Sequence, residues 1–171
     1  MAAIPEKIVN YNIYDEGEKL VGITNEVTLP NFEAMAEEIS GAGIAGAFES
    51  PTPGHFGSIE MEIPFRTVSD QTFRLAVPGG RTITLRASQQ GYDVSGGQVN
   101  YRGLKITLRG LPKGINLGTA TIGQPTGTTN LIEVLYIKIE ENDKTLLELD
   151  KLNFIYVVNG VDVLGEIRQQ I

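Results

Sequence analysis

Residues 37–66 constrain the fold of this chain most, because a cluster of glycines is followed there by a run in which apolar and polar side chains alternate strictly. Gly41, Gly43 and Gly46 spell G-x-G-x-x-G, the spacing of a dinucleotide-binding loop, and an acidic residue follows about twenty positions later. Such a loop must open a helix, yet residues 48–54 contain two prolines and a glycine, which interrupt helices. We therefore expect these glycines to serve the backbone and expect no bound cofactor.

Residues 58–66 alternate between apolar and polar side chains, which predicts a strand with one buried face and one wet face. The apolar members are Ile59, Met61, Ile63 and Phe65. Ser58, Glu60 and Glu62 fall on the wet face, where the two carboxylates lie about 7 Å apart. A glycosidase would bring its two carboxylates from opposite sides of a cleft with aromatic platforms, and the chain has no tryptophan. We expect no catalytic residue here.

Several blocks of sequence together carry a resemblance to a known family. They are GAGIAG, SP, GHFGS and FRTV within residues 41–68, RGLPKGINLG at 109–118, YIKI at 136–139, LELDKLNFIY at 147–156 and the N-terminal IPEKIVNYNIY. From Ile4 to about Arg168 the chain resembles the major tail tube protein of contractile phage tails of the P2 type (FII-like) and of the related R-type bacteriocins.

The resemblance implies a single tail tube domain over residues 1–171. It implies a mainly β fold, a two-sheet antiparallel sandwich or barrel with one short α-helix, whose sheets continue between subunits in a hexameric ring. Stacked rings would form the inner tube of a contractile tail, a virion structural component and not an enzyme. Implied partners are further copies, the tail sheath protein, and baseplate and tail terminator proteins. DNA would pass through the lumen without specific binding.

The location implied by the resemblance is the virion or an extracellular contractile particle, after assembly in the host cytoplasm. We expect no membrane anchor, because no apolar run approaches 18 residues and the N-terminus lacks a signal-peptide pattern. An R-type bacteriocin or related particle would use the same architecture without DNA. A monomeric β-sandwich that binds carbohydrate is a different class and would need exposed aromatic side chains.

A tube that conducts DNA should have an acidic lumen, because each basic wall residue adds nonspecific affinity for phosphate. Ser58, Glu60 and Glu62 are the lumen candidates. Contacts between rings are expected at the turn of residues 15–17 and at the loop of residues 41–57, since glycine permits positive φ and close backbone approach. The ring-contact candidates are Asp15, Glu16, Gly17, Gly41, Gly43 and Gly46.

Charge is distributed unevenly along the chain, whose formal net charge is -7. Residues 1–66 hold 3 basic and 11 acidic side chains, residues 81–113 hold 6 and 1, and residues 131–171 hold 4 and 8. We expect the positive middle of one copy to meet the negative ends of the next, as head-to-tail assembly requires. A nucleic-acid patch would need more stacking partners than Tyr92 and Tyr101, and solvated strand faces are the plain alternative.

The remaining pattern predicts mostly strands. The expected strands are residues 8–14 and 18–29 around the turn at 15–17, 82–88 and 99–111, and 131–140 and 145–158 around Asn142-Asp143. Residues 31–39 fit a helix or a strand, and the resemblance favours the strand. A helix is expected over residues 69–77, with Ser69 as N-cap and Phe73, Ala76 and Val77 on its apolar side.

A strand over residues 145–158 would reach about 45 Å, and long strands with unpaired edges aggregate unless neighbours cover them. This length favours a protein completed by its own copies. Residues 114–130 carry no charge and are expected to form a mobile or interface loop.

Metal and triad chemistry have few candidate residues. His55 is the only histidine and there is no cysteine, so we expect a structural hydrogen bond from its ring and no zinc site. The acidic residues at 140–150 do not match the spacing of a calcium loop and are expected to form an acidic hairpin tip.

Overall fold

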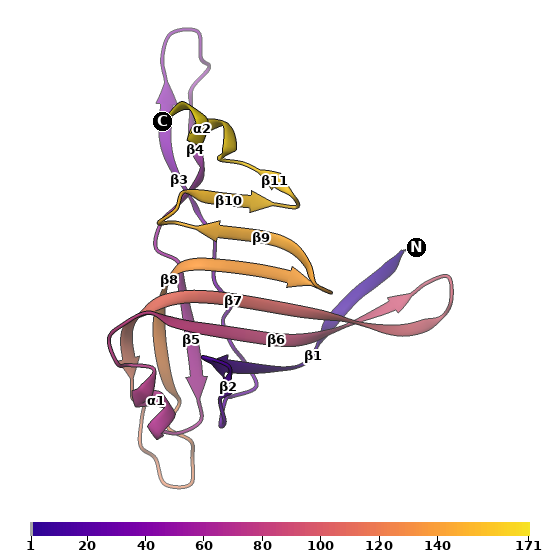
Figure 1. Ribbon diagram of the computed structural model, residues 1–171, viewed down its shortest axis with the longest axis vertical. Coiled ribbons are helices and arrows are strands. Elements are labelled where there is room, and N and C mark those ends of the chain that lie inside the picture. Colours follow the sequence, from indigo (N-terminus) through magenta and orange to yellow (C-terminus); the bar gives the residue numbers. More distant parts are fainter. Residues whose placement is uncertain (1) are drawn as a thin grey trace.

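The computed structural model describes residues 2–171, and the chain is built mainly from antiparallel strands (Figure 1). Met1, the first residue of the expected domain, lies outside the described residues. The strands are β1 (Ala3–Asp15), β2 (Glu18–Lys19), β3 (Ala34–Ser40), β4 (Ala47–Phe56), β5 (Glu60–Phe65), β6 (Arg81–Asp93), β7 (Gln98–Asn116), β8 (Thr128–Glu141), β9 (Lys144–Asp150), β10 (Ile155–Val158) and β11 (Val161–Asp162). Two short helices, α1 (Asp70–Arg74) and α2 (Gly165–Gln170), complete the fold, and α2 was not predicted.

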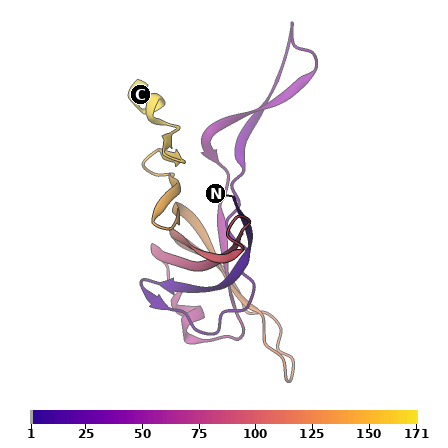
Figure 2. The same cartoon turned by 90° about the vertical axis from the view of Figure 1, so that its right-hand side faces the viewer.

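Nine strands form one sheet in the order β11-β10-β9-β8-β7-β6-β1-β2, with β5 paired to β8. The first half of β8 pairs with β5 and its second half pairs with β9, so both of these strands lie along the same edge of β8. β3 and β4 form a separate hairpin that projects from the body (Figures 1 and 2). The mainly β fold with two antiparallel sheets is therefore confirmed.

The core lies on one side of the curved nine-stranded sheet. On β5 the predicted alternation is confirmed, because Met61, Ile63 and Phe65 are each at most 1% exposed while Glu60 and Glu62 face solvent. Buried residues of the long strands belong to the same core cluster; these are Ile13, Ile83, Leu85, Ile106, Leu108, Ile132, Val134 and Ile137. Each such side chain contributes about 1.5–3 kcal/mol by leaving water, so the alternation fixes which face of each strand turns inward.

Two tight turns set the register of two hairpins. Glu16 and Gly17 have φ of 50° and 85°, and Asn142 and Asp143 have φ of 47° and 64°. Consecutive positive φ values belong to the two-residue turns whose twist matches that of paired strands. The hairpin across Asn142 and Asp143 is confirmed, with Glu141 opposite Lys144.

The predicted strand over residues 18–29 is wrong beyond Lys19. β2 has two residues, and the chain then turns at Gly22, where φ is 83°. The following segment crosses the end of the core instead of continuing the sheet. Its backbone is held by hydrogen bonds from Arg66 N to Gly22 O and from Thr24 N to Pro64 O.

The predicted strand over residues 145–158 is also wrong, because it is divided into β9 and β10. The carboxylate of Asp150 accepts hydrogen bonds from the backbone N–H groups of Leu152 and Asn153, and Phe154 has a φ of 55°. The chain therefore reverses, and β10 pairs antiparallel with β9.

The expectation for residues 31–39 is confirmed, and that for the helix over residues 69–77 is confirmed only in part. β3 confirms the extended form of residues 31–39, and the helical alternative is wrong. Helix α1 follows Ser69 as expected, but it has a single turn and buries Thr72, with Leu75 just beyond it. Phe73 and Val77 are 52% and 56% exposed, so the predicted apolar side of this helix is wrong.

Apolar side chains gather on parts of the chain that extend beyond the core. β6 and β7 continue past it as a long ribbon beside the first half of β1, and the hairpin of β3 and β4 projects at another end (Figures 1 and 2). Exposed hydrophobic residues on these projections include Ile4, Ile8, Val9, Ile39, Ile44, Phe48, Val94, Val99 and Tyr101. The loop between β7 and β8 adds Ile122, which is fully exposed.

Candidate functional site

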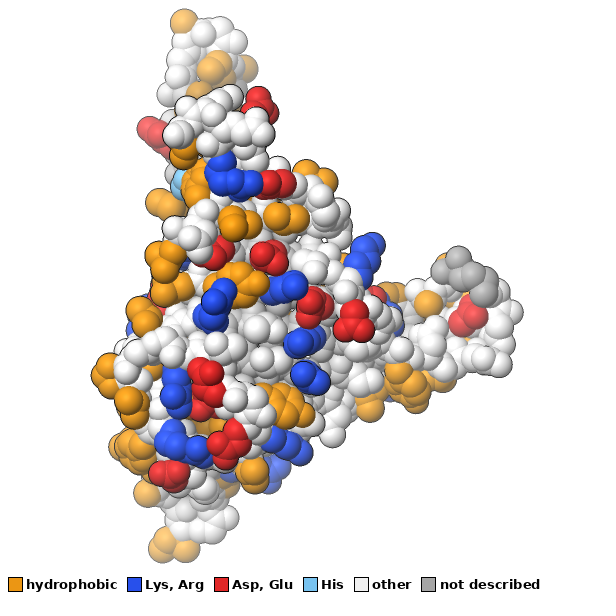
Figure 3. Space-filling model, in the orientation of Figure 1, with side chains coloured by type: hydrophobic (Ala, Val, Ile, Leu, Met, Phe, Trp, Pro, Cys, Tyr) orange, Lys and Arg blue, Asp and Glu red, His pale blue; other side chains and the backbone are white. Residues whose placement is uncertain are grey.

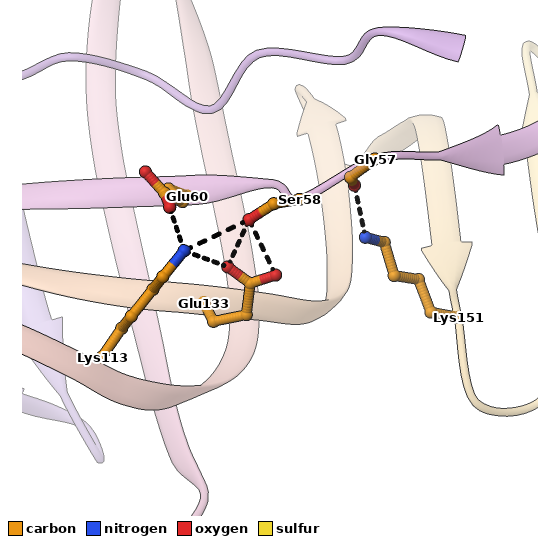
Figure 4. A network of polar contacts seen from close by, with 6 residues as sticks. All are labelled: Gly57, Ser58, Glu60, Lys113, Glu133 and Lys151. Atoms are coloured by element: carbon orange, nitrogen blue, oxygen red, sulfur yellow. Dashed lines mark hydrogen bonds and ion pairs between the residues drawn. The ribbon is translucent and has the colours of Figure 1, made fainter. Parts of the chain in front are cut away.

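Two of the three lumen candidates, Ser58 and Glu60, lie together in a polar network (Figure 4). The hydroxyl of Ser58 donates to the Glu133 carboxylate at 2.7 Å, and Lys113 Nζ makes an ion pair with Glu60 and lies 3.4 Å from Glu133 Oε2. Glu62 lies next along the same side of β5. Lys113 and Glu133 were not predicted to lie here, because 53 residues separate Lys113 from Glu60 and 75 residues separate Glu133 from Ser58.

A β-bulge explains why Lys113 reaches this network. On β7, Pro112 pairs with Ile132 and Gly114 pairs with Leu131, so Lys113 has no partner in the ladder. A bulged residue is redirected relative to the regular pleat. Its ammonium group crosses β8 to β5, where the hydrogen bond to Glu60, with the nearby charge of Glu133, raises the pKa of Lys113.

The network continues along one side of the nine-stranded sheet, which we call the polar face. A second irregularity, at Leu135, lets Glu133 and Tyr136 lie on the same side of β8. The charged and aromatic residues of the polar face are Tyr14, Glu60, Glu62, Arg86, Lys105, Arg109, Lys113, Glu133, Tyr136, Lys138, Glu140, Glu148 and Asp150. In the space-filling view, basic and acidic side chains are interleaved across the middle of the body (Figure 3).

Every basic side chain of the polar face has a partner within the chain. The guanidinium groups of Arg86 and Arg109 lie over the rings of Tyr14 and Tyr136, at 5.6 and 4.2 Å from the ring centroids. Lys105 and Lys138 both pair with Glu140, as described below, and Lys113 pairs with Glu60 and Glu133.

The same holds for the basic segment of residues 81–113 as a whole. Arg81 pairs with Asp15 at 2.8 Å and Arg102 pairs with Glu141 at 3.1 Å, so all six of its basic residues are engaged. The sheet order explains this pairing, since β6 and β7 lie between β1 and β8, which supply the acidic partners of Arg81, Arg102 and Lys105. Contact between the positive middle of one copy and the negative ends of the next stays a prediction.

The turn proposed for ring contacts is only partly accessible. Asp15 is 7% exposed and bound to Arg81, and burial raises the pKa of its carboxyl although Arg81 opposes that shift. Glu16 and Gly17 are exposed, and Glu16 Oε1 accepts a hydrogen bond from the backbone N–H of Thr82 at 2.8 Å. The turn therefore offers Glu16 and Gly17 to a neighbour, and Asp15 holds the turn to β6.

The expected loop of residues 41–57 is mostly strand β4, and only its glycine-rich part forms the tip of the hairpin. Gly41, Gly43 and Gly46 all have positive φ there, and none has a heavy atom within 4 Å of an added Cβ. No helix follows the three glycines, which agrees with the rejection of a dinucleotide loop. No Lys or Arg occurs in residues 20–65, so the hairpin is an acidic arm with an apolar tip.

Aromatic contacts fix the base of this hairpin to the C-terminal part of the chain. The ring of Phe56 lies 5.1 Å from that of Tyr156, and the ring of His55 lies 5.6 Å from that of Phe154. His55 Nδ1 is 3.0 Å from the carbonyl oxygen of Pro53, in keeping with the structural role expected of it.

The first strand borders an incomplete part of the sheet. β1 is paired with β6 along most of its length, but on its other side it pairs only through Tyr14 and Asp15. Beside that edge lies a groove of about 830 Å³ with a mixed polar and apolar lining, formed by β1 and residues within 19–29 together with Leu85, Ala87 and Leu104. An unpaired edge next to exposed apolar side chains is a site where another strand adds.

Residues 2–171 contain no cluster of three or more His, Cys, Asp or Glu side chains placed to hold a metal ion. None of the helices in this part of the chain has the length and apolar character needed to cross a bilayer.

An open sheet edge combined with apolar arms defines a class of β protein that assembles through its margins. Residues 5–171 match the family described as phage tail tube protein FII, and the chain belongs to this family. It is 30% identical over 158 residues to the major tail tube protein of Serratia phage KSP20, covering 92% of this chain and 90% of that one. It is 27% identical over 172 residues to the tail tube protein of Escherichia phage P2, covering 99% and 98%.

A solved structure shares the fold. It is the sheath/tube terminator, in the extended state, of an extracellular contractile injection system called PVC. The TM-score is 0.54 at 10% identity, over 80% of this chain and 96% of that one.

Proposed function

We propose that this protein forms hexameric rings that stack into the inner tube of a contractile tail, through which DNA is delivered. The observation that carries the proposal is the unpaired edge of β1 beside exposed apolar side chains, in a chain of the tail tube family. Ring closure pairs such edges, and a head-to-tail contact that repeats along an axis produces a tube.

The projecting elements provide the contacts between rings. The tip of the β3 and β4 hairpin, with Gly41, Gly43 and Gly46, reaches the adjacent ring, and Glu16 and Gly17 form a second contact. Support comes from the exposed apolar residues of the tip, Ile44 and Phe48, which gain stability when a neighbour covers them.

The polar face lines the lumen, with Ser58, Glu60 and Glu62 at its β5 side. Support comes from the separation of the polar face from the apolar surfaces, since the exposed apolar residues of β1, β3 and β4 lie on the projections. Five basic and six acidic side chains make this face nearly neutral with a slight acidic excess. On this face the three lysines are paired with carboxylates, which compete with phosphate for them, and the two arginines lie over tyrosine rings.

Residues 1–171 act as one structural domain without an enzymatic step. Its partners are further copies, the sheath protein, and terminator and baseplate proteins. The protein assembles in the host cytoplasm and functions in the virion or in an extracellular particle. The family assignment and the shared fold with a sheath/tube terminator support this setting.

Single-cysteine labelling of assembled tubes tests the arrangement, because the chain has no cysteine of its own. Thr107→Cys on the polar face and Glu62→Cys on β5 should react with a small maleimide but not with a large polyethylene glycol maleimide. Phe73→Cys on α1 should react with both. Electron microscopy of the same samples should show tubes with six-fold rings. A protein that stays monomeric even with preformed tail bases contradicts the proposal, and purified particles without a genome favour a bacteriocin tube.

A further inference from the structure

Glu140 occupies a special position on the polar face, because one carboxylate serves two lysines. Lys105 lies directly opposite it on β7, with its Nζ 3.9 Å away, and Lys138 lies two positions earlier on β8, with its Nζ 3.2 Å away. The Glu140 side chain is 17% exposed, against 41% for Lys105 and 33% for Lys138. The carboxylate is therefore held within the sheet surface while the two ammonium groups lie above it.

The neighbouring cations explain why a carboxylate is needed at position 140. Arg86 lies directly opposite Lys105 on the other side, and like charges in directly opposed positions destabilise a sheet. Arg86 is drawn toward the ring of Tyr14, whereas Lys105 turns to Glu140. The hydrogen bond to Glu140 also raises the pKa of Lys138.

We propose that Glu140 masks Lys105 and Lys138 and thereby keeps the polar face from binding the phosphate backbone of double-stranded DNA. The inference rests on the proposed function, in which this face borders the DNA conduit. A lysine binds phosphate by releasing a condensed counterion, and one that is already paired must first give up its carboxylate. Without Glu140, Arg86, Lys105 and Lys138 form a basic strip across the neighbouring strands β6, β7 and β8, bordered by Glu148, which lies opposite Lys138 on β9.

The test measures the binding of a short fluorescent DNA duplex of mixed sequence to the full chain before assembly, by anisotropy over a range of salt concentrations. We expect Glu140→Gln to bind about tenfold more tightly than the original chain at low salt, with a salt slope steeper by about 1 to 2. Glu49→Gln, which removes the same charge from the projecting hairpin, is the matched control and should change little. Equal gains in the two variants would show a net-charge effect and overturn the proposal.

A second measurement does not depend on the folding of Glu140→Gln. Changing Lys105 and Lys138 together to Gln in the original chain should alter DNA affinity less than twofold, because masked lysines contribute little. A severalfold loss would show that the lysines already bind phosphate and would overturn the masking role. In the triple variant that also carries Glu140→Gln, the gain in affinity should disappear. Electron microscopy of the original chain after assembly separates the two proposals, since missing tubes there contradict the proposed function, whereas DNA binding unchanged by Glu140→Gln contradicts the masking.

Discussion

Arg81 Nη2 lies 2.8 Å from Asp15 Oδ2, and this ion pair ties the first hairpin turn to the start of β6. The Asp15 side chain is 8% exposed, and its Oδ1 is buried without a hydrogen-bond partner among the described residues. Burial therefore raises the pKa of Asp15 while Arg81 lowers it. The pKa of Asp15 therefore depends on two opposing effects, burial and the charge of Arg81, and a substitution of Arg81 should change it.

Arg81→Met should destabilise the protein by about 3 kcal/mol at pH 7, the lower end of the cost of removing one partner of a buried pair, because it leaves a buried carboxylate without its counter-ion. The pKa of Asp15 in the folded state should then rise further. A group with a raised folded pKa supports stability at low pH and loses that contribution as pH rises through the folded value. The loss should therefore shrink when urea unfolding is repeated near pH 4. Arg81→Lys, which keeps the charge, should recover part of the stability, and a pH-independent loss would contradict this account.

Gly110→Ala should destabilise the sheet by about 3 kcal/mol, the upper end of the cost of overpacking. A Cβ at this position would lie 2.2 Å from the carbonyl oxygen of Glu133, a backbone atom of the adjoining strand. Gly114→Ala is the matched control on the same strand, since its Cβ meets nothing within 4 Å. The measurement is the thermal unfolding of the two variants. Equal stabilities would show that the backbone of β7 and β8 can move apart at Gly110 without cost and would contradict this prediction.

Ile44→Ser with Phe48→Ser should leave the folded monomer within about 0.5 kcal/mol of its original stability, because both side chains are exposed. Tube formation should fall sharply if the hairpin tip contacts the next ring. Polymer yield by sedimentation and unfolding by urea provide the two readings. Phe73→Ser on α1 removes an equally exposed aromatic ring and should leave polymerisation unchanged. Normal tubes from the tip variant would remove the hairpin from the ring contact.

Glu60→Lys with Glu62→Lys should leave tube assembly nearly intact and reduce DNA delivery by about tenfold or more, because added wall cations hold phosphate in every ring. The new lysine at position 60 would also face Lys113, its former partner. Infectivity per assembled particle is the measurement, and the double Gln variant, which adds no cation, should lose less. Failure to polymerise would instead assign these residues to an interface.

Much of the fold could be predicted because its determinants are local. The alternation around Ile63 fixed the strand and its buried face, since a one-residue shift would place every apolar side chain in water. The turn at Asn142 and Asp143 was visible because few residue types adopt positive φ. The predicted strands at residues 18–29 and 145–158 failed, because the first must cover the end of the core and the second is stopped by hydrogen bonds to Asp150.

The polar face was predicted only in part. Glu60 and Glu62 were placed on the wet side of β5 correctly, but their surroundings came from Lys113 on β7 and Glu133 on β8. No spacing in the sequence indicates that a bulged lysine will cross a strand to reach them. The segregation of charge along the chain predicts contact between neighbouring copies, and that stays a prediction. The pairing within the chain depends on the sheet order, which the sequence did not indicate.

The sequence alone determined the β character, the inward face of each correctly placed strand and the family, because these depend on side-chain period, turn chemistry and ordered blocks of residues. Only the tertiary structure decided which cations meet which carboxylates and which sheet edge stays open. Those outcomes depend on strand order and on two irregularities of the β7 and β8 ladder, and such long-range pairings arise from the packing of the whole sheet.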